Sequence, residues 1–304
     1  MKLPIRRSTL ILPVNNPRFV EKAYLRGADA IMLDLEDSIP LHEKENARKL
    51  VKSSIPIASR GGGDVFVRIN KDPVLMAQDL QASVYSGLAG IVFPKTESGE
   101  EVQNLETAVE KLERDHGIES EIVFDLLIES PQGILNLQKI AGASKRIQSL
   151  TLGPEDYCRE LGVEPSAEGI ELHYPLAQIV TICKPKGIKP MGLMGSIGEF
   201  RDLGKFERSA AQARQLGCEG ASCIHPDQVE VLNQIFSPDP AKVERARRVV
   251  EAFEEGVKRG TASVSVDRQM VDIPVYNRAR LVLEHAEAIA SLGKKKATAL
   301  ARLA

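Results

Sequence analysis

Short apolar runs rich in β-branched residues recur along the chain, and each pair of runs is separated by enough residues for one helix. Runs of this length and composition are typical of buried strands in a parallel sheet. The predicted strands are Thr9–Pro13, Ala30–Leu35, Asp64–Ile69, Gly90–Pro94, Glu121–Ile128, Ser149–Leu152, Lys189–Met194 and Glu219–Ile224.

The segments between these strands have helical spacing of their apolar residues, and some carry a proline near their start. The predicted helices are Pro17–Arg26, Glu43–Ser53, Val74–Ser86, Glu100–Asp115, Gln132–Ala141, Ala167–Cys183, Phe200–Gln215 and Pro226–Ile235. Strand–helix alternation favours parallel strands joined by right-handed crossovers, and its eightfold repeat predicts a closed (β/α)8 TIM barrel. An open doubly wound sheet is the alternative, but no GxGxxG motif follows the first strand.

The chain continues beyond the eighth unit, so we assign residues 1–237 to the barrel and 238–304 to a C-terminal helical extension. In the extension, Asp239–Lys258 and Val275–Ser291 have helical patterns, Gly260–Val266 is β-prone, and Gly293–Ala304 is a lysine-rich tail. We expect the extension to pack on its own barrel or on a neighbouring subunit.

Composition argues for a globular protein without a nucleic-acid or membrane partner. Of the 304 residues, 43% are hydrophobic, and 40 basic against 42 acidic residues give a net charge of −2, so no global field favours a polyanion. The sequence contains no apolar stretch long enough to span a membrane and no secretory signal, which indicates a cytoplasmic location. The four cysteines form no CxxC pair and are expected to be reduced.

Charged residues gather just after four of the predicted strands. They are Asp34, Glu36 and Asp37 after the second, Arg68 after the third, Glu129 after the fifth, and Glu155 and Asp156 after the sixth. Because active sites of (β/α)8 barrels lie at the C-terminal ends of their strands, this pattern predicts an acidic pocket containing an arginine. Such a pocket suits a divalent cation and an anionic substrate.

Glu129 and Asp156 follow neighbouring strands and could together hold one Mg²⁺, which prefers carboxylate oxygens and keeps sites open for water or substrate. A solvated or salt-bridged pair is the alternative for these two acids. Arg68 is placed to bind a substrate carboxylate through two parallel hydrogen bonds. Its alternative role is that of a structural partner for Asp34 or Glu36.

The acids after the second strand are crowded, so mutual repulsion could raise the pKa of one of them toward a catalytically useful value. This makes Glu36 and Asp37 candidate acid–base residues, although Asp37 could instead cap the helix that follows. Lys95 could form a Schiff base, as in class I aldolases, but pairing with Glu97 is the preferred interpretation.

Two further motifs carry weaker signals. His225, after the eighth strand, could be a metal ligand or a base, but a hydrogen-bonded structural histidine is at least as compatible with its surroundings. The glycine-bearing segment Gly192–Gly198 follows the seventh strand, where barrels often bind phosphate. A tight turn is the simpler interpretation of that segment.

The chain resembles the citrate lyase β-subunit-like branch of the HpcH/HpaI aldolase family almost from end to end. The matching segments are RSTLILPVNNPRFVEKA, GADAIMLDLEDSIPLHEKENAR, VFVRIN, VFPKTES, IESPQGILN, LGPEDYCRELG, CIHPDQVEVLNQIF and QMVDIPVYNRARLVL. The resemblance implies a TIM barrel with an extended C-terminal segment, in a homotrimer or a dimer of trimers. It also implies that Glu129 and Asp156 are Mg²⁺ ligands, with Glu129 beside the substrate, and that Arg68 binds a substrate carboxylate.

By the same resemblance, Asp272 is an acid–base residue supplied from the adjacent subunit, and Glu36 and Asp37 lie near the water shell of the metal. One departure concerns the first loop, which in the family usually reads PGNRP and here is Pro13–Pro17, PVNNP. The missing glycine and arginine put the usual acyl-CoA substrate in question, but not the metal chemistry.

We therefore expect a Mg²⁺-dependent carbon–carbon lyase that acts on a β-hydroxyacyl-CoA thioester such as malyl-, citramalyl- or citryl-CoA. Its products would be a 2-oxo acid and an acyl-CoA. A metal-dependent aldolase acting on free 4-hydroxy-2-oxo acids is the second interpretation. A non-catalytic 2-oxo-acid-binding or accessory subunit is the third.

Overall fold

Eight parallel strands form the centre of the first part of the chain in the computed structural model, which describes residues 4–166, 168–198 and 200–303. The strands are β1 (Ser8–Pro13), β2 (Ala30–Asp34), β3 (Asp64–Arg68), β4 (Gly90–Phe93), β5 (Val123–Ile128), β6 (Ile147–Leu152), β7 (Lys189–Met191) and β8 (Ala221–Cys223). Every strand predicted from the sequence is present.

The sheet curls until its two ends meet. Strand β1 pairs with both β2 and β8, and the strand order is β7-β6-β5-β4-β3-β2-β1-β8. Between β7 and β8, the backbone N–H of Glu219 donates to Pro190 O at 2.9 Å and that of Gly192 donates to Gly220 O at 3.0 Å. These bonds bring the sheet to a nearly closed (β/α)8 barrel, so the TIM-barrel prediction is confirmed and the open-sheet alternative is wrong.

Alternate residues of each strand face opposite sides of the barrel wall. On β2, Ile31 and Leu33 belong to the main apolar core between strands and helices, whereas Ala30 and Met32 belong to a smaller cluster. The other buried members of that smaller cluster are Phe66, Val92, Val123 and Leu127. They fill the barrel interior beneath the C-terminal ends of the strands, as in other barrels of this size.

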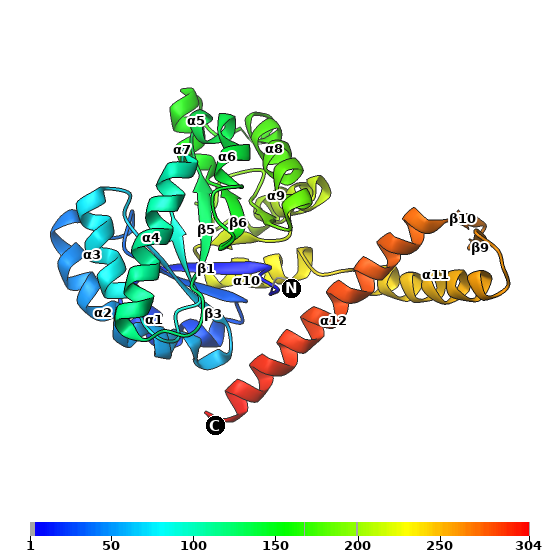
Figure 1. Ribbon diagram of the computed structural model, residues 1–304, viewed down its shortest axis with the longest axis horizontal. Helices are drawn as coiled ribbons and strands as arrows, with labels where there is room; N and C mark the ends of the chain where they lie inside the picture. The colour runs from blue at the N-terminus through cyan, green and yellow to red at the C-terminus, as the bar shows by residue number, and fades with distance from the viewer. Residues whose placement is uncertain (1–3, 167, 199, 304) are drawn as a thin grey trace. The chain divides into compact units, whose positions relative to one another are not determined.

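Helices surround the strands on the outside of the barrel (Figure 1). They are α1 (Pro17–Ala23), α2 (Lys44–Ala58), α3 (Pro73–Ser83), α4 (Gly99–His116), α5 (Pro131–Leu135), α6 (Leu137–Ile140), α7 (Pro154–Leu161), α8 (Ile170–Lys186), α9 (Leu203–Leu216) and α10 (Pro226–Ile235). Single 3₁₀ turns occur at Tyr24–Arg26, Leu41–Glu43 and Ser59–Gly61.

Several helix boundaries differ from the sequence-based expectation for local reasons. The helix predicted over Gln132–Ala141 is broken at Asn136, whose side-chain Nδ2 donates to Glu97 O at 2.7 Å. Helix α9 begins after Asp202, because that side chain caps Lys205 N, rather than at Phe200. Helix α7 has no counterpart in the predicted elements, and position 167, where α8 was expected to start, lies outside the described residues.

The second compact unit comprises Ser237–Thr298. It contains α11 (Pro240–Lys258), the antiparallel strands β9 (Val264–Val266) and β10 (Gln269–Val271), and most of α12 (Ile273–Ala301). Its own small core includes Val249, Phe253 and Val271, and the rings of Phe253 and Tyr276 stack with centroids 4.7 Å apart.

Two features of this unit were not predicted. The hairpin turns at Asp267 and Arg268, which both have positive φ, and the sequence there lacks the glycine or asparagine usual in such turns. Helix α12 extends through the lysine-rich segment, so the predicted tail is helical as far as Ala301.

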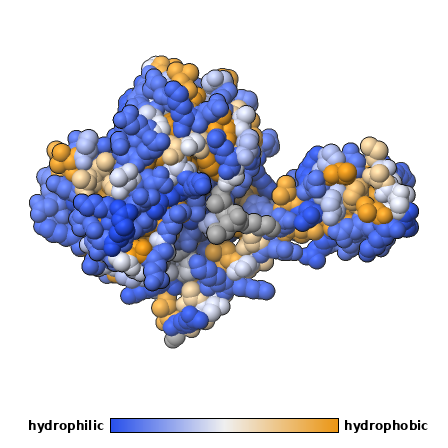
Figure 2. Space-filling view, viewed as in Figure 1, coloured by the Kyte–Doolittle hydropathy of each residue, from blue (hydrophilic) through white to orange (hydrophobic). Residues whose placement is uncertain are grey.

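The face of the molecule seen in Figure 2 is mainly hydrophilic with scattered apolar residues. Among the described residues, no helix combines the length and apolar character that crossing a bilayer requires.

Candidate active site

An ion pair joins the C-terminal ends of β2 and β3. The strand register places Asp34 opposite Arg68, and Arg68 Nε and Nη2 donate to the two carboxylate oxygens of Asp34, both at 2.7 Å. Asp34 also accepts hydrogen bonds from the backbone N–H groups of Glu36 and Ser38, each at 3.0 Å. One buried carboxylate therefore fixes both the guanidinium and the turn that carries the next two acids.

Both members of this pair keep their charge at neutral pH. Burial alone would raise the pKa of Asp34, but the hydrogen bonds and charge of Arg68 outweigh burial and lower it. Burial alone would lower the pKa of Arg68, and Asp34 raises it instead. The two parallel hydrogen bonds that were expected for a substrate carboxylate are thus made with Asp34, the structural partner considered as the alternative for Arg68. Its Nη1 lies 3.1 Å from Glu36 Oε2 and 3.8 Å from Asp37 Oδ2.

Lys95 links two acids of the site through one residue. Its Nζ contacts Glu36 Oε1 at 2.5 Å and lies 3.6 Å from Asp37 Oδ1, while its backbone N–H donates to Glu129 Oε2 at 2.8 Å. The φ angle of Lys95 is +50°, an uncommon conformation for a residue with a side chain. This backbone geometry aims the N–H at one acid and the side chain at another.

The expected pairing of Lys95 with Glu97 is wrong. Glu97 Oε2 lies 3.3 Å from Lys71 Nζ instead. Burial by itself would lower the pKa of the Lys95 amine, but hydrogen bonding and the charges of Glu36 and Asp37 raise it. A protonated amine is a poor nucleophile, which disfavours a Schiff-base role.

Glu129, at the end of β5, is the most deeply buried acid of the predicted metal pair, with 5% of its surface exposed. The pKa of Glu129 is raised to about 7, mainly by burial and also by the charges of Asp156 and Glu36, against the lowering effect of the Lys95 N–H. The carboxylate lies against Gly153, where an added Cβ would approach Glu129 Cγ and Cδ to 2.5 and 2.8 Å. Gly153 is therefore required by the position of Glu129.

Asp156 lies in the first turn of α7, the helix that the sequence analysis missed. Its side chain is 15% exposed and pairs with Arg159 one turn later. Asp156 is close enough to affect the pKa of both Glu129 and Lys95, so the two predicted metal ligands share one region. The ion pair with Arg159 also matches the alternative considered for Asp156, a salt-bridged acid.

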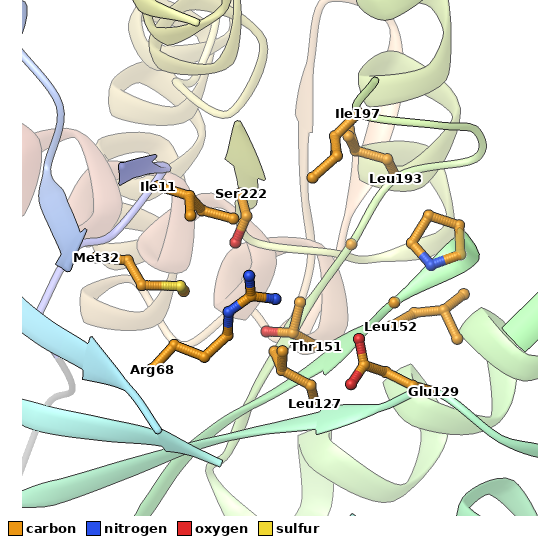
Figure 3. Close-up of a pocket in the computed structure, with 13 residues that line it drawn as sticks. Ile11, Met32, Arg68, Leu127, Glu129, Thr151, Leu152, Leu193, Ile197 and Ser222 are labelled. Carbon is orange, nitrogen blue, oxygen red and sulfur yellow. The ribbon is translucent and has the colours of Figure 1, made fainter. Parts of the chain in front are cut away.

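A cavity of about 70 Å³ lies above the barrel interior, and Arg68 and Glu129 both line it. Figure 3 shows the Arg68 guanidinium and the Glu129 carboxylate extending into the cavity from opposite sides, with Thr151 between them. Its other lining residues are mostly apolar and include Ile11, Met32, Leu127, Leu152, Leu193 and Ile197. A second hollow, lined by Glu36, Asp37, Lys95, Lys44 and Lys71 among others, lies beside the same acids.

The donor set fits Mg²⁺ through two carboxylates. No group of three or more His, Cys, Asp and Glu side chains is arranged like metal ligands among the described residues. Mg²⁺ commonly uses only one or two protein carboxylates and fills its remaining positions with water and substrate. Glu129, desolvated and repelled by neighbouring acids, is a carboxylate that a cation would stabilise.

The structure also shows the local contacts of the remaining predicted residues. Asp272 is in the second unit, where its Oδ1 accepts from Val275 N at 3.1 Å in the first turn of α12. His225 Nδ1 accepts from Asp227 N at 3.3 Å and caps α10, which is the structural role considered for it. In the Gly192–Gly198 segment, Leu193 and Ile197 contribute apolar surface to the cavity.

Comparison with known proteins places the chain in a family. The sequence model of the HpcH/HpaI aldolase/citrate lyase family matches residues 7–226. Citrate lyase subunit beta of Haemophilus influenzae is 36% identical over 287 residues, which cover 94% of this chain and 98% of that protein. L-malyl-CoA/β-methylmalyl-CoA lyase of Cereibacter sphaeroides is 30% identical, with 94% and 96% covered.

The fold also matches a solved structure. The CitE protein of Mycobacterium tuberculosis, crystallised with magnesium, acetoacetate and coenzyme A, superposes with a TM-score of 0.73 at 23% identity, covering 94% of this chain and 100% of that one. The chain belongs to the HpcH/HpaI aldolase/citrate lyase family. Within that family it falls in the citrate lyase β-subunit-like branch, and it is a carbon–carbon lyase.

Asp34→Asn should release Arg68 and loosen the turn that carries Glu36 and Asp37. Removing one partner of a buried ion pair costs about 3–5 kcal/mol of unfolding free energy, which urea titration would measure, and pyruvate binding by calorimetry should weaken. Asp64→Asn is the matched control, because Asp64 pairs with Arg6 Nε at 3.0 Å away from the site. If both variants bound pyruvate like the unsubstituted protein, the anchoring role of Asp34 would be refuted.

Gly153→Ala should displace the Glu129 carboxylate, because the new methyl group overlaps it. We expect a stability loss of about 1–3 kcal/mol. We also expect added Mg²⁺ to raise the melting temperature of the unsubstituted protein but not that of this variant. Gly293→Ala is the control, since an added Cβ there meets nothing within 4 Å. An undiminished Mg²⁺ response in Gly153→Ala would contradict the described position of Glu129.

Proposed function

We propose that the protein is a Mg²⁺-dependent lyase that cleaves or forms a β-hydroxyacyl-CoA thioester, such as malyl-, citramalyl- or citryl-CoA. The products of cleavage would be a 2-oxo acid and an acyl-CoA. The observation that carries this proposal is the buried Glu129 carboxylate, close to Asp156 and extending into the same cavity as Arg68. The related citrate lyase β subunits and malyl-CoA lyase support the thioester class.

Glu129 and Asp156 would hold the Mg²⁺, and the bound ion would polarise the substrate carbonyl or hydroxyl oxygen as a Lewis acid. Support comes from the M. tuberculosis relative, which was crystallised with magnesium. Glu129 must be ionised to bind the ion, and its raised pKa means that metal binding competes with a proton near neutral pH.

Arg68 would hold the carboxylate of the acid half of the substrate or an oxyanion that develops there. Its guanidinium keeps a full charge, and Asp34 fixes two of its nitrogens, so little side-chain freedom is lost when a ligand binds. The apolar walls around Arg68 exclude water from this contact, which strengthens it.

In cleavage, a base removes the proton of the β-hydroxyl group, the carbon–carbon bond breaks as the carbonyl forms, and the thioester enolate is then protonated. Asp272 of a neighbouring subunit, Glu36 or Asp37 would be the acid–base residue. Among the acids after β2, Glu36 has its pKa raised, with burial as the largest cause. Asp37 is the more exposed of the two.

We further propose that the protein is a cytoplasmic homo-oligomer, a trimer or hexamer, in which the extension over residues 238–304 packs on a neighbouring subunit. A small second unit that carries Asp272 is compatible with this arrangement. The partners would be a 2-oxo acid and an acyl-CoA.

A substrate panel tests the reaction class. Malyl-, citramalyl- and citryl-CoA are assayed beside free 4-hydroxy-2-oxo acids with Mg²⁺, and we expect cleavage of at least one thioester. Glu129→Ala should lower that activity by at least about a thousandfold, since it removes a metal ligand. Cleavage of free acids alone would replace the thioester proposal with the aldolase. Oxo-acid binding without turnover of any panel member would favour a non-catalytic subunit.

The Mg²⁺-induced rise in melting temperature should grow as the pH increases through about 7. Glu129 has a raised pKa in the folded state, so without metal its ionisation lowers the free energy of unfolding between its unfolded pKa and about 7. Mg²⁺ binds the ionised form, and its stabilising effect must therefore weaken below pH 7. Differential scanning calorimetry with Mg²⁺ or EDTA measures this, and Glu129→Gln should abolish the dependence. A pH-independent shift would exclude Glu129 as a ligand.

A further inference from the structure

Thr151 and Asp125 form a polar pair inside the barrel, at the border of the cavity. Thr151, on β6, lines the cavity with Arg68 and Glu129 (Figure 3). Its hydroxyl Oγ1 donates to Asp125 Oδ1 at 2.9 Å, and Asp125 lies on β5 in the buried barrel interior. A carboxylate is rare in such a position unless it is hydrogen-bonded.

The hydrogen bond determines what Thr151 can offer to a ligand. A hydroxyl group has one proton and two lone pairs, and an ionised carboxylate can only accept. Because the Thr151 proton is directed to Asp125, the side of Oγ1 that faces the cavity can only accept a hydrogen bond. Burial raises the pKa of Asp125 to about 6, against the lowering effects of Thr151, Ser149 and the charge of Arg6, so Asp125 is ionised above neutral pH.

The cavity therefore presents two complementary polar surfaces. Arg68 has only donors, whereas Thr151 presents an acceptor beside it. A ligand that matches both carries an anionic oxygen and a hydroxyl proton on adjacent groups. A 2-hydroxy acid has this arrangement, and the corresponding 2-oxo acid does not, because its carbonyl oxygen would face the Thr151 lone pairs.

We propose that Thr151, oriented by Asp125, is a specificity-determining residue that selects the hydroxyl-bearing acid over the oxo acid. This rests on the proposed function, in which the bound substrate contains a 2-hydroxy-acid group and the product is a 2-oxo acid. The Thr151 acceptor favours the substrate and weakens the hold on the product. Asp125 acts only through Thr151 and is a positioning residue.

The test compares the binding of racemic lactate and pyruvate by calorimetry, with Mg²⁺ present and at mildly alkaline pH. In Thr151→Val the lactate-to-pyruvate affinity ratio should fall about three- to tenfold, the equivalent of one hydrogen bond. Thr151→Ser keeps the hydroxyl and should keep the ratio. Ser149→Ala removes another partner of Asp125 at a position that does not line the cavity, and should also keep the ratio.

The outcomes separate this inference from the proposed function. An unchanged ratio in Thr151→Val, with both acids still bound, overturns the role of Thr151 and leaves the lyase proposal standing. Failure of both acids to bind the unsubstituted protein contradicts the acid site itself, and the inference with it.

A structure of the unsubstituted protein with Mg²⁺ and lactate gives a second test that does not depend on the folding of a variant. The lactate hydroxyl should lie within hydrogen-bond distance of Thr151 Oγ1. A lactate carboxylate in that place would overturn the inference.

Discussion

The ion pair between Asp34 and Arg68 sets the position of the other charges in the site. Asp34 is fully buried and uses both oxygens on the guanidinium while also accepting two backbone N–H groups of the following turn. Burying two charges is costly unless geometry and additional hydrogen bonds compensate, and here the register of β2 and β3 supplies that geometry. The turn that follows brings Glu36 to Arg68 Nη1, the guanidinium nitrogen that does not contact Asp34.

The second organising feature is an excess of negative charge at the mouth of the barrel. The acids of this cluster are Asp34, Glu36, Asp37, Glu129 and Asp156, and the cations that pair with them are Arg68, Lys95 and Arg159. Burial adds to the repulsion, and the pKa of Glu129 rises as a result. An environment of this kind favours either a retained proton or a bound cation. The carboxylate pair and the arginine therefore act as one electrostatic unit.

The sequence predicted the barrel because most strands lie in predominantly apolar runs separated by helical patterns, and both faces of a barrel wall are buried. It also predicted which strand ends carry charge. It did not predict partners that depend on side-chain direction: Lys95 contacts Glu36 rather than Glu97, because a positive φ turns its side chain back toward β2. Local hydrogen bonding explains other misses, such as the break at Asn136.

Some site residues gave no signal in the sequence at all. Gly153 leaves room for the carboxylate of Glu129, which follows the neighbouring strand β5. Thr151 is oriented by its hydrogen bond to Asp125, which lies on β5 as well. Contacts between strands are set by register, and register follows from packing of the whole barrel rather than from a local pattern. Asp125 itself interrupts an otherwise apolar run, which was the one visible indication of a polar group in the interior.

The left-handed backbone at Lys95 has a mechanical consequence. The side chain of this residue contacts Glu36, and its backbone N–H donates to Glu129. A rotation of this one peptide unit would therefore change both contacts. One residue is therefore the common hydrogen-bonding partner of two carboxylates that come from different strands. The position of Lys95 is thus shared by the Glu129 side and the Arg68 side of the site.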